Sequence, residues 1–205
     1  MKRSFQINNK MKTLLRIDSS PRKQTSISRQ LADVLQEKLE KSEQFSTLKR
    51  DVYYDELVTL GNEDSVTAYF TPEDQQTSTQ REAVASSNIL ASEFSKADTY
   101  IFSVPMYNFG VTAGLKAYID LISRAGISFK YTENGPVGLL ENKKAYVIIT
   151  TGGTKLGTGV DHVTGYMKTF LNFLGITDIE FINSDQIMAD AEQVIAKATE
   201  IINNI

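Results

Sequence analysis

The sequence TYIFSV, at residues 99–104, determines the fold class. It is nearly all apolar, and Pro105 follows it directly. A strand that is buried on both faces has this continuous pattern, whereas a strand with one solvated face alternates apolar and polar residues. Proline cannot donate to a strand ladder, so we expect Pro105 to end the strand. The stretch therefore predicts a central strand of a parallel sheet.

Strand-like and helix-like segments alternate on both sides of this strand. Further strands are predicted at residues 13–18, 46–52, 145–149 and 179–182. Helices with apolar residues three and four positions apart are predicted at 28–41, around 83–94, around 115–122, at 163–174 and at 189–202. Parallel strands need covering helices as crossovers. The pattern predicts a flavodoxin-like α/β fold, a doubly wound five-stranded parallel sheet in the order 2-1-3-4-5 with helices on both faces.

The composition excludes several kinds of chemistry. The 205 residues include no cysteine and one histidine, which excludes disulfides, thiolate nucleophiles and multi-histidine metal sites, so no metal is expected. The net charge of −3 gives no polyanion-binding surface, so nucleic acid is not an expected partner. No apolar run approaches the roughly 18–20 residues that a membrane span needs. If the chain is an enzyme, a bound cofactor is expected to supply its chemistry.

Two segments are expected to lie outside the regular core. Residues 1–10 are basic and polar and lack the apolar stretch of a secretory signal, which favours a cytoplasmic protein. We expect residues 1–12 to be a disordered extension, with Met11 as an alternative start, and residues 13–205 to form one domain. Residues 53–78 are polar and predict a long loop that can hold a short helix.

Ligands of open α/β sheets bind beyond the carboxyl ends of the strands, so a ligand site is expected among the residues that follow the strands. After the first strand, residues 19–28 (SSPRKQTSIS) are rich in hydroxyl groups and lead into a helix start. Free N–H groups and the positive end of the helix dipole suit a phosphate there. The alternative is a plain serine-rich loop in which Ser26 or Ser28 caps the helix.

The exits of the third and fourth strands are also unusual. Residues 106–110 (MYNFG) place two aromatic rings, a thioether and an amide at a strand end, which suits a flat ring system with a polar rim. Residues 150–154 (TTGGT) contain paired glycines, which allow close approach of a ligand or a turn with positive φ. Alternatively, Tyr107 and Phe109 pack beneath a neighbouring loop and the glycines form a simple turn.

The three exits meet at one edge of the sheet in the predicted strand order. Hydroxyl groups at a helix start, aromatic and amide groups, and paired glycines together predict a site for flavin mononucleotide (FMN). Elsewhere, Asp161 is expected to be the N-cap of the helix at 163–174, and His162 to be exposed on its first turn.

Three motifs resemble the FMN-dependent NADH-azoreductases, also called FMN-dependent NADH:quinone oxidoreductases. They are MYNF at 106–109, SRAGISFKYTENGP at 123–136 and the glycine pair at 152–153, and the resemblance extends from about Thr13 over nearly the whole chain. It implies a homodimer with one non-covalent FMN per subunit at the dimer interface. It also implies ping-pong two-electron (hydride) transfer from NADH or NADPH through FMN to quinones, and reductive cleavage of aromatic azo compounds.

The resemblance also implies site residues, none of which acts as an acid or base. The implied cofactor contacts are Ser20, Ser26, Ile27, Ser28, Met106, Tyr107, Asn108, Phe109, Thr150, Thr151, Gly152 and Gly153. The implied substrate pocket comprises Phe109, Tyr131, Phe170 and Phe173. Family members often have Ser-Arg before the paired glycines, and Thr150-Thr151 stand there in this chain.

Two rival functions remain open at this point. A flavodoxin-like carrier of single electrons would have the same fold, although such carriers are typically more acidic than this chain. A non-flavin interaction domain would use the serine-rich loop only as a structural cap.

Overall fold

The computed structural model describes residues 11–55 and 60–205. Most of the expected extension at residues 1–12 lies outside this part of the chain. Lys12 is described, and it is the first residue of β1 (Lys12–Asp18), one residue earlier than the predicted strand.

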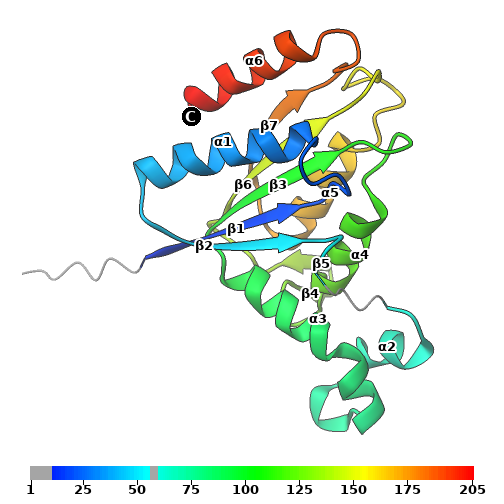
Figure 1. Ribbon diagram of the computed structural model, residues 1–205. Coiled ribbons are helices and arrows are strands. Elements are labelled where there is room, and N and C mark those ends of the chain that lie inside the picture. The colour runs from blue at the N-terminus through cyan, green and yellow to red at the C-terminus, as the bar shows by residue number, and fades with distance from the viewer. Residues whose placement is uncertain (1–10, 56–59) are drawn as a thin grey trace, which may run out of the picture.

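The sheet has five parallel strands (Figure 1). The strands are β1, β2 (Phe45–Asp51), β3 (Thr99–Pro105), β6 (Lys144–Thr150) and β7 (Asp178–Ser184). Their order is β2-β1-β3-β6-β7, and every neighbouring pair is parallel. This is the predicted order 2-1-3-4-5, because β4 and β5 belong to a separate two-stranded sheet.

Helices cover both faces of the sheet (Figure 1). On one face lie α1 (Ile27–Ser42) and α6 (Ala191–Asn203), which pack over Leu14, Ile101 and Ile148. On the other face lie α3 (Ser78–Lys96), α4 (Ala113–Ile122) and α5 (Thr164–Leu174). Successive side chains of a strand point to opposite faces, so each strand contributes to both halves of the core.

The central strand is buried along its whole length. All seven residues of β3 are buried, as the apolar pattern predicts. Pro105 is its last residue and pairs with Thr150 of β6, so the strand extends one residue further than expected. The strand therefore delivers Met106 and Tyr107 directly to the carboxyl edge of the sheet.

The predicted loop at 53–78 contains the short helix that the sequence allowed, α2 (Glu63–Ala68), and residues 56–59 lie outside the described part. Three short elements were not predicted. One is a 3₁₀ turn (Glu73–Gln75) in the same loop. Strands β4 (Phe129–Thr132) and β5 (Gly135–Gly138) form an antiparallel hairpin. Each hairpin strand has four residues and is mostly exposed, so it has no apolar run to reveal it.

The last helix begins two residues later than predicted. Asp190 is the N-cap of α6, and Ala191, its first residue, is exposed. In α3 the buried residues include Val84, whereas Ala83 is only partly buried. In the described residues, no helix is both long and apolar enough to cross a membrane.

Candidate functional site

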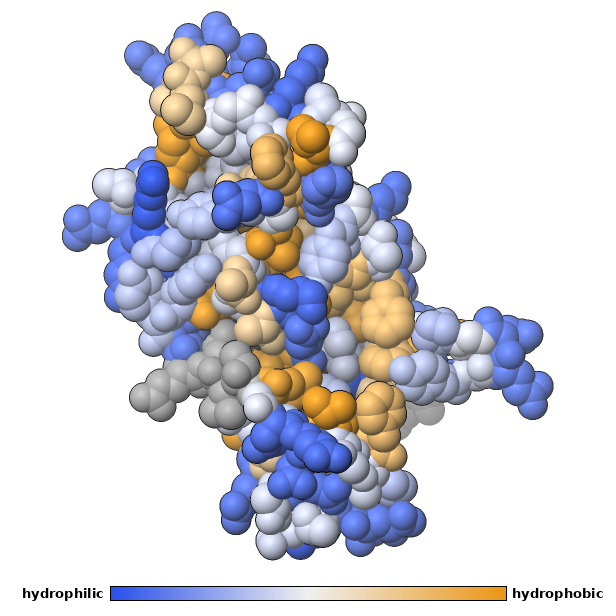
Figure 2. All heavy atoms as spheres, turned by 90° about the vertical axis from the view of Figure 1, so that its right-hand side faces the viewer, coloured by the Kyte–Doolittle hydropathy of each residue, from blue (hydrophilic) through white to orange (hydrophobic). Residues whose placement is uncertain are grey.

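The carboxyl ends of β1, β3 and β6 open into one cavity of about 440 Å³. Its lining consists of Ser20, Arg22, Thr25, Ser26, Ile27, Pro105, Met106, Tyr107, Thr150, Thr151, Gly152, Ile187 and Met188. This edge of the sheet faces the viewer in Figure 2, where apolar groups run down the middle of the face between hydrophilic ones. The three predicted exits thus share one hollow. Eight of the twelve predicted contact residues line it.

The hydroxyl-rich exit leads into the N-terminus of α1. Ser26 is the N-cap, and its Oγ accepts a hydrogen bond of 3.4 Å from the amide of Arg29. The amides of Ile27 and Ser28 have no acceptor within the described residues, as is normal for a first helical turn. Ser26 therefore caps the helix, as the alternative proposed, and the unpaired N–H group of Ile27 belongs to a residue that lines the cavity.

Ser28 lies outside the cavity lining. Its side chain is fully buried, and its Oγ lies 3.1 Å from both Ser26 Oγ and Ser103 Oγ. The Ser28 hydroxyl is thus used inside the protein and does not reach the cavity.

Residues 107–110 form a tight turn at the end of β3. The amides and carbonyls of Tyr107 and Gly110 bond to one another at 3.0 and 3.1 Å. Asn108 and Phe109 between them have φ of 48° and 69°. Two positive φ values in a two-residue hairpin are typical of a type I′ turn, which favours Asn-Gly over Asn-Phe. A bulky residue in this region costs about 1–2 kcal/mol, and such strain collects at functional sites.

This turn holds its aromatic side chains in solvent. Phe109 is 51% exposed and Tyr107 is 39% exposed, so they do not pack beneath a neighbouring loop. Tyr107 lines the cavity, whereas Asn108 and Phe109 lie beyond its lining. The carbonyl of Phe109 accepts from the amide of His162 at 3.1 Å, which ties the turn to the loop before α5.

The paired glycines have ordinary backbone conformations, and the missing side chain of Gly152 allows another residue to approach closely. Neither Gly152 nor Gly153 has a positive φ. A Cβ on Gly152 would lie 3.2 Å from the sulfur of Met188, so the missing side chain lets Met188 lie over the strand exit. Gly153 has open space around it and lies outside the cavity lining.

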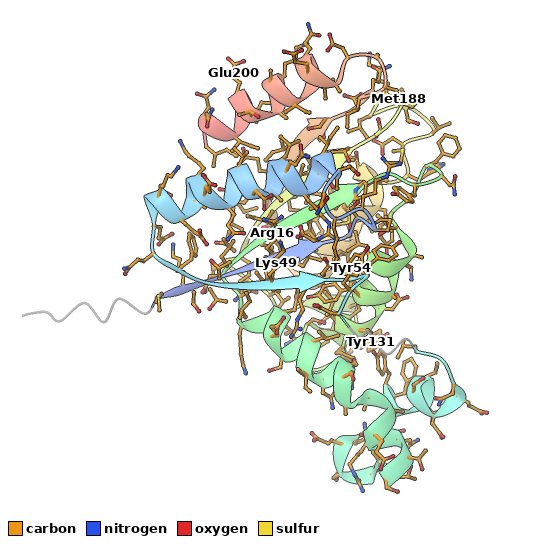
Figure 3. All side chains as sticks on the ribbon, viewed as in Figure 1. Arg16, Lys49, Tyr54, Tyr131, Met188 and Glu200 are labelled. Atoms are coloured by element: carbon orange, nitrogen blue, oxygen red, sulfur yellow. The ribbon has the colours of Figure 1, made fainter. Side chains whose placement is uncertain are left out.

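Ile187 and Met188 are site residues that the sequence analysis missed. Their amides donate to the carbonyls of Thr151 and Gly152 at 3.1 and 2.9 Å. Thr151 uses its hydroxyl within the protein, donating to the Thr154 carbonyl and accepting from the Gln186 amide. Met188 is 85% exposed and lies at the carboxyl edge (Figure 3). Their signal was an apolar pair in a polar loop directly after β7.

A buried ion cluster lies behind the hydroxyl-rich loop. Arg29 donates to both carboxylate oxygens of Asp51 (2.6 and 2.9 Å), to Asp18 (3.3 Å) and to the Ser20 carbonyl (2.5 Å). Asp18 is fully buried and also pairs with Arg16 and with Lys49, each at 3.0 Å. Arg29 thus fixes the backbone at Ser20.

The ion cluster also changes the acidity of Asp51. Burial pushes the pKa of its carboxyl upward, but hydrogen bonds from the Arg29 guanidinium and the Tyr53 amide outweigh burial. The pKa of Asp51 therefore lies below its ordinary value. Charged residues such as Arg16 and Asp18 inside a predicted buried strand were the sequence signal for this cluster.

The predicted substrate-pocket residues do not meet within one chain. Phe170 is 6% exposed and belongs to the core, because it lies on the inward stripe of α5. Phe173 packs on Phe129 with ring centroids 4.5 Å apart. Tyr131, on β4, is 65% exposed and meets the Phe129 ring edge-on at 5.3 Å. Tyr131 and Phe109 are thus the two exposed rings of the predicted four.

Asp161 caps α5 from a different position than predicted. Val163 occupies the N-cap position, and the Asp161 carboxylate accepts from the amides of Val163 and Thr164 at 3.0 Å. Burial pushes the pKa of Asp161 upward, but hydrogen bonds from Gly157, Thr164 and Val163 bring it below its ordinary value. His162 is exposed, as expected.

The sheet order and the cavity at its switch point define a flavodoxin-like α/β protein with a ligand site at the carboxyl edge. The family model described as flavodoxin-like fold matches residues 11–205. One relative is FMN-dependent NADH:quinone oxidoreductase 1 of Hahella chejuensis, which is 48% identical over 92% of this chain and 95% of its own length. Another is FMN-dependent NADH:quinone oxidoreductase 1 of Colwellia psychrerythraea, which is 42% identical over 94% of this chain and 99% of its own length. The chain therefore belongs to the flavodoxin-like family, among the FMN-dependent NADH:quinone oxidoreductases.

Solved structures agree with this placement. An azoreductase from Bacillus anthracis superposes with a TM-score of 0.85 at 26% identity, covering 95% of this chain and 100% of the other. An FMN-dependent NADH-azoreductase from the same species, in complex with FMN, superposes with a TM-score of 0.84 at 26% identity. The match covers 95% of this chain and 97% of the other.

Proposed function

We propose that this chain is an FMN-dependent oxidoreductase that moves two electrons from NADH to a quinone or an aromatic azo compound. The supporting observation is the single cavity, where free helix amides and hydroxyl groups converge with exposed aromatic and thioether side chains. The relatives named as quinone oxidoreductases at 42–48% identity favour this enzyme over a carrier of single electrons.

The residues present fit FMN. At one end of the cavity the unpaired amide of Ile27 and the hydroxyls of Ser20, Thr25 and Ser26 suit a phosphate. At the other end, Met106 and Tyr107 offer the apolar surface that a flat ring system needs, and we place the polar rim of the ring near Asn108, Thr150 and Gly152. FMN supplies the redox chemistry when bound, and the protein supplies position and electrostatics.

We further propose that the substrate pocket forms between two copies of the chain. Several large apolar side chains stand exposed on the described surface, namely Phe109 (51%), Tyr131 (65%), Val160 (49%) and Met188 (85%). A second copy would cover some of them and narrow the open cavity. Phe173 and Phe129 would then act indirectly, since they hold Tyr131 from below. We place this homodimer in the cytoplasm.

The test uses the purified protein loaded with FMN. We expect NADH to bleach its visible absorbance without oxygen, and menadione to restore it. Initial rates should give parallel double-reciprocal lines, because donor and acceptor use the same slot in turn. Intersecting lines would reject the shared slot. A protein that binds no FMN would reject the whole proposal, and one that exchanges only one electron at a time would support the carrier.

A further inference from the structure

The turn at residues 21–23 directs two adjacent cationic side chains to different places. Arg22 lines the cavity beside Ser20, Thr25 and Ser26. Lys23 instead lies outside, with its Nζ 3.7 Å from the centroid of the Tyr54 ring.

Tyr54 holds this turn from the outer side. Its hydroxyl donates to the carbonyl of Pro21 at 2.8 Å. Tyr54 itself is fixed at the end of β2 (Figure 3), because its amide bonds to the carbonyl of Asp51 at 3.1 Å. On the inner side, the amide of Arg22 donates to Ser20 Oγ at 3.2 Å. Residues 21 and 22 are thus held from opposite sides.

The cavity depends on Arg22 for its positive charge. Among the described residues that line it, Arg22 is the one with a charged side chain, and it forms no ion pair within the described chain. The neighbouring cation Arg29 is neutralised by Asp18 and Asp51. A phosphate monoester has about −1.5 to −2 charges at pH 7, and a helix N-terminus offers about half a positive charge. The Arg22 guanidinium, at the phosphate end of the cavity, would balance much of the negative charge that the helix N-terminus leaves uncompensated.

We propose that Arg22 binds the phosphate of FMN and sets the preference for FMN over unphosphorylated riboflavin, with Tyr54 as the positioning residue that directs Arg22 into the cavity. This inference rests on the proposed function, because it assigns a residue to the phosphate end of that site. Lys23 has the same charge one residue away but points elsewhere, so it is the matched control.

The experiment measures dissociation constants of the apo-protein for FMN and for riboflavin by quenching of flavin fluorescence. A charged hydrogen bond contributes about 1.5–3 kcal/mol, so Arg22→Gln should raise the dissociation constant for FMN by about 10- to 100-fold. The dissociation constant for riboflavin should stay within about two-fold of the wild-type value. Lys23→Gln should change FMN affinity by less than about three-fold. Both glutamine variants remove one positive charge from the same turn.

Tyr54 is tested by the loss of its hydroxyl alone. Tyr54→Phe should weaken the binding of FMN by about 3- to 10-fold without changing the affinity for riboflavin. Tyr53→Phe should change neither affinity. Combining Tyr54→Phe with Arg22→Gln should add no further loss, because Tyr54 acts through Arg22. A loss of stability alone would weaken both flavins together.

Three results would overturn the inference while leaving the proposed function intact. They are equal FMN affinity in Arg22→Gln and wild type, equal losses in Arg22→Gln and Lys23→Gln, and equal weakening of FMN and riboflavin. A wild-type protein that binds neither flavin would overturn the proposed function as well.

Discussion

Replacing Arg29 by methionine should destabilise the protein by about 3 kcal/mol. Methionine preserves much of the buried volume but removes two hydrogen bonds to Asp51, one to Asp18 and one to the Ser20 carbonyl. Breaking a buried ion pair costs about 3–5 kcal/mol because a charge stays behind without its partner. Asp18 still has its ion pair with Arg16 in this variant, so most of the lost stability arises at Asp51. We therefore expect a loss at the lower end of the range for a broken buried ion pair.

The measurement is urea unfolding of the apo-protein at pH 7 and fixed concentration, extrapolated linearly to water. Asp51→Asn in the Arg29→Met background should recover about 1–2 kcal/mol relative to the sum of the single losses, because the orphaned carboxylate is gone. The cost of Arg29→Met should shrink as the pH falls below the ordinary carboxyl value of 3.8, since the pKa of native Asp51 is depressed and its stabilisation is lost on protonation. A loss below about 1 kcal/mol, or strictly additive variants, would refute this reasoning.

Three further comparisons test the packing and the pH dependence. Tyr118→Phe should leave the melting temperature unchanged or raise it, because the buried Tyr118 hydroxyl has no hydrogen-bond partner among the described residues. Tyr100→Phe should lower the melting temperature by removing a hydrogen bond of 2.7 Å to the Phe94 carbonyl. Gly138→Ala should cost about 1–3 kcal/mol, since its Cβ would lie 2.1 Å from backbone at the end of α5, while Gly153→Ala, with open space, should cost much less. The pKa of Asp161 is depressed, so wild type should lose stability more steeply below pH 3.8 than Asp161→Asn in acid unfolding.

The sheet and the strand exits were predictable because their signals are local. An apolar run such as residues 99–104 identifies a buried strand, and a parallel sheet then brings the carboxyl ends of its strands to one edge. Phe170 shows the limit of this reasoning. An aromatic residue on an amphipathic helix can face a pocket or the core, and only the packing of α5 shows that it faces the core. Met188 was missed because its one signal, an apolar pair in the polar loop after β7, does not distinguish a ligand contact from an ordinary loop residue.

Charged residues in the first strand signalled the ion cluster behind the site, but local patterns could not identify their partners, for a different reason. Arg29 and Asp51 are 22 residues apart, and they meet because the parallel register of β1 and β2 pairs Asp18 with Asp51. Two carboxylates at neighbouring strand ends would repel each other without a cation between them. Arg29 supplies that cation from the first turn of α1.

A cation at a helix N-terminus opposes the helix dipole, so the position of Arg29 needs a compensation. The cluster provides it by pairing Arg16, Arg29 and Lys49 with Asp18, Asp33 and Asp51, three charges of each sign. It therefore fixes the loop mechanically while adding little net field at the cavity. Attraction of an anion is then left to the free amides of α1 and to Arg22, which predicts that Arg22→Gln will flatten the salt dependence of FMN binding.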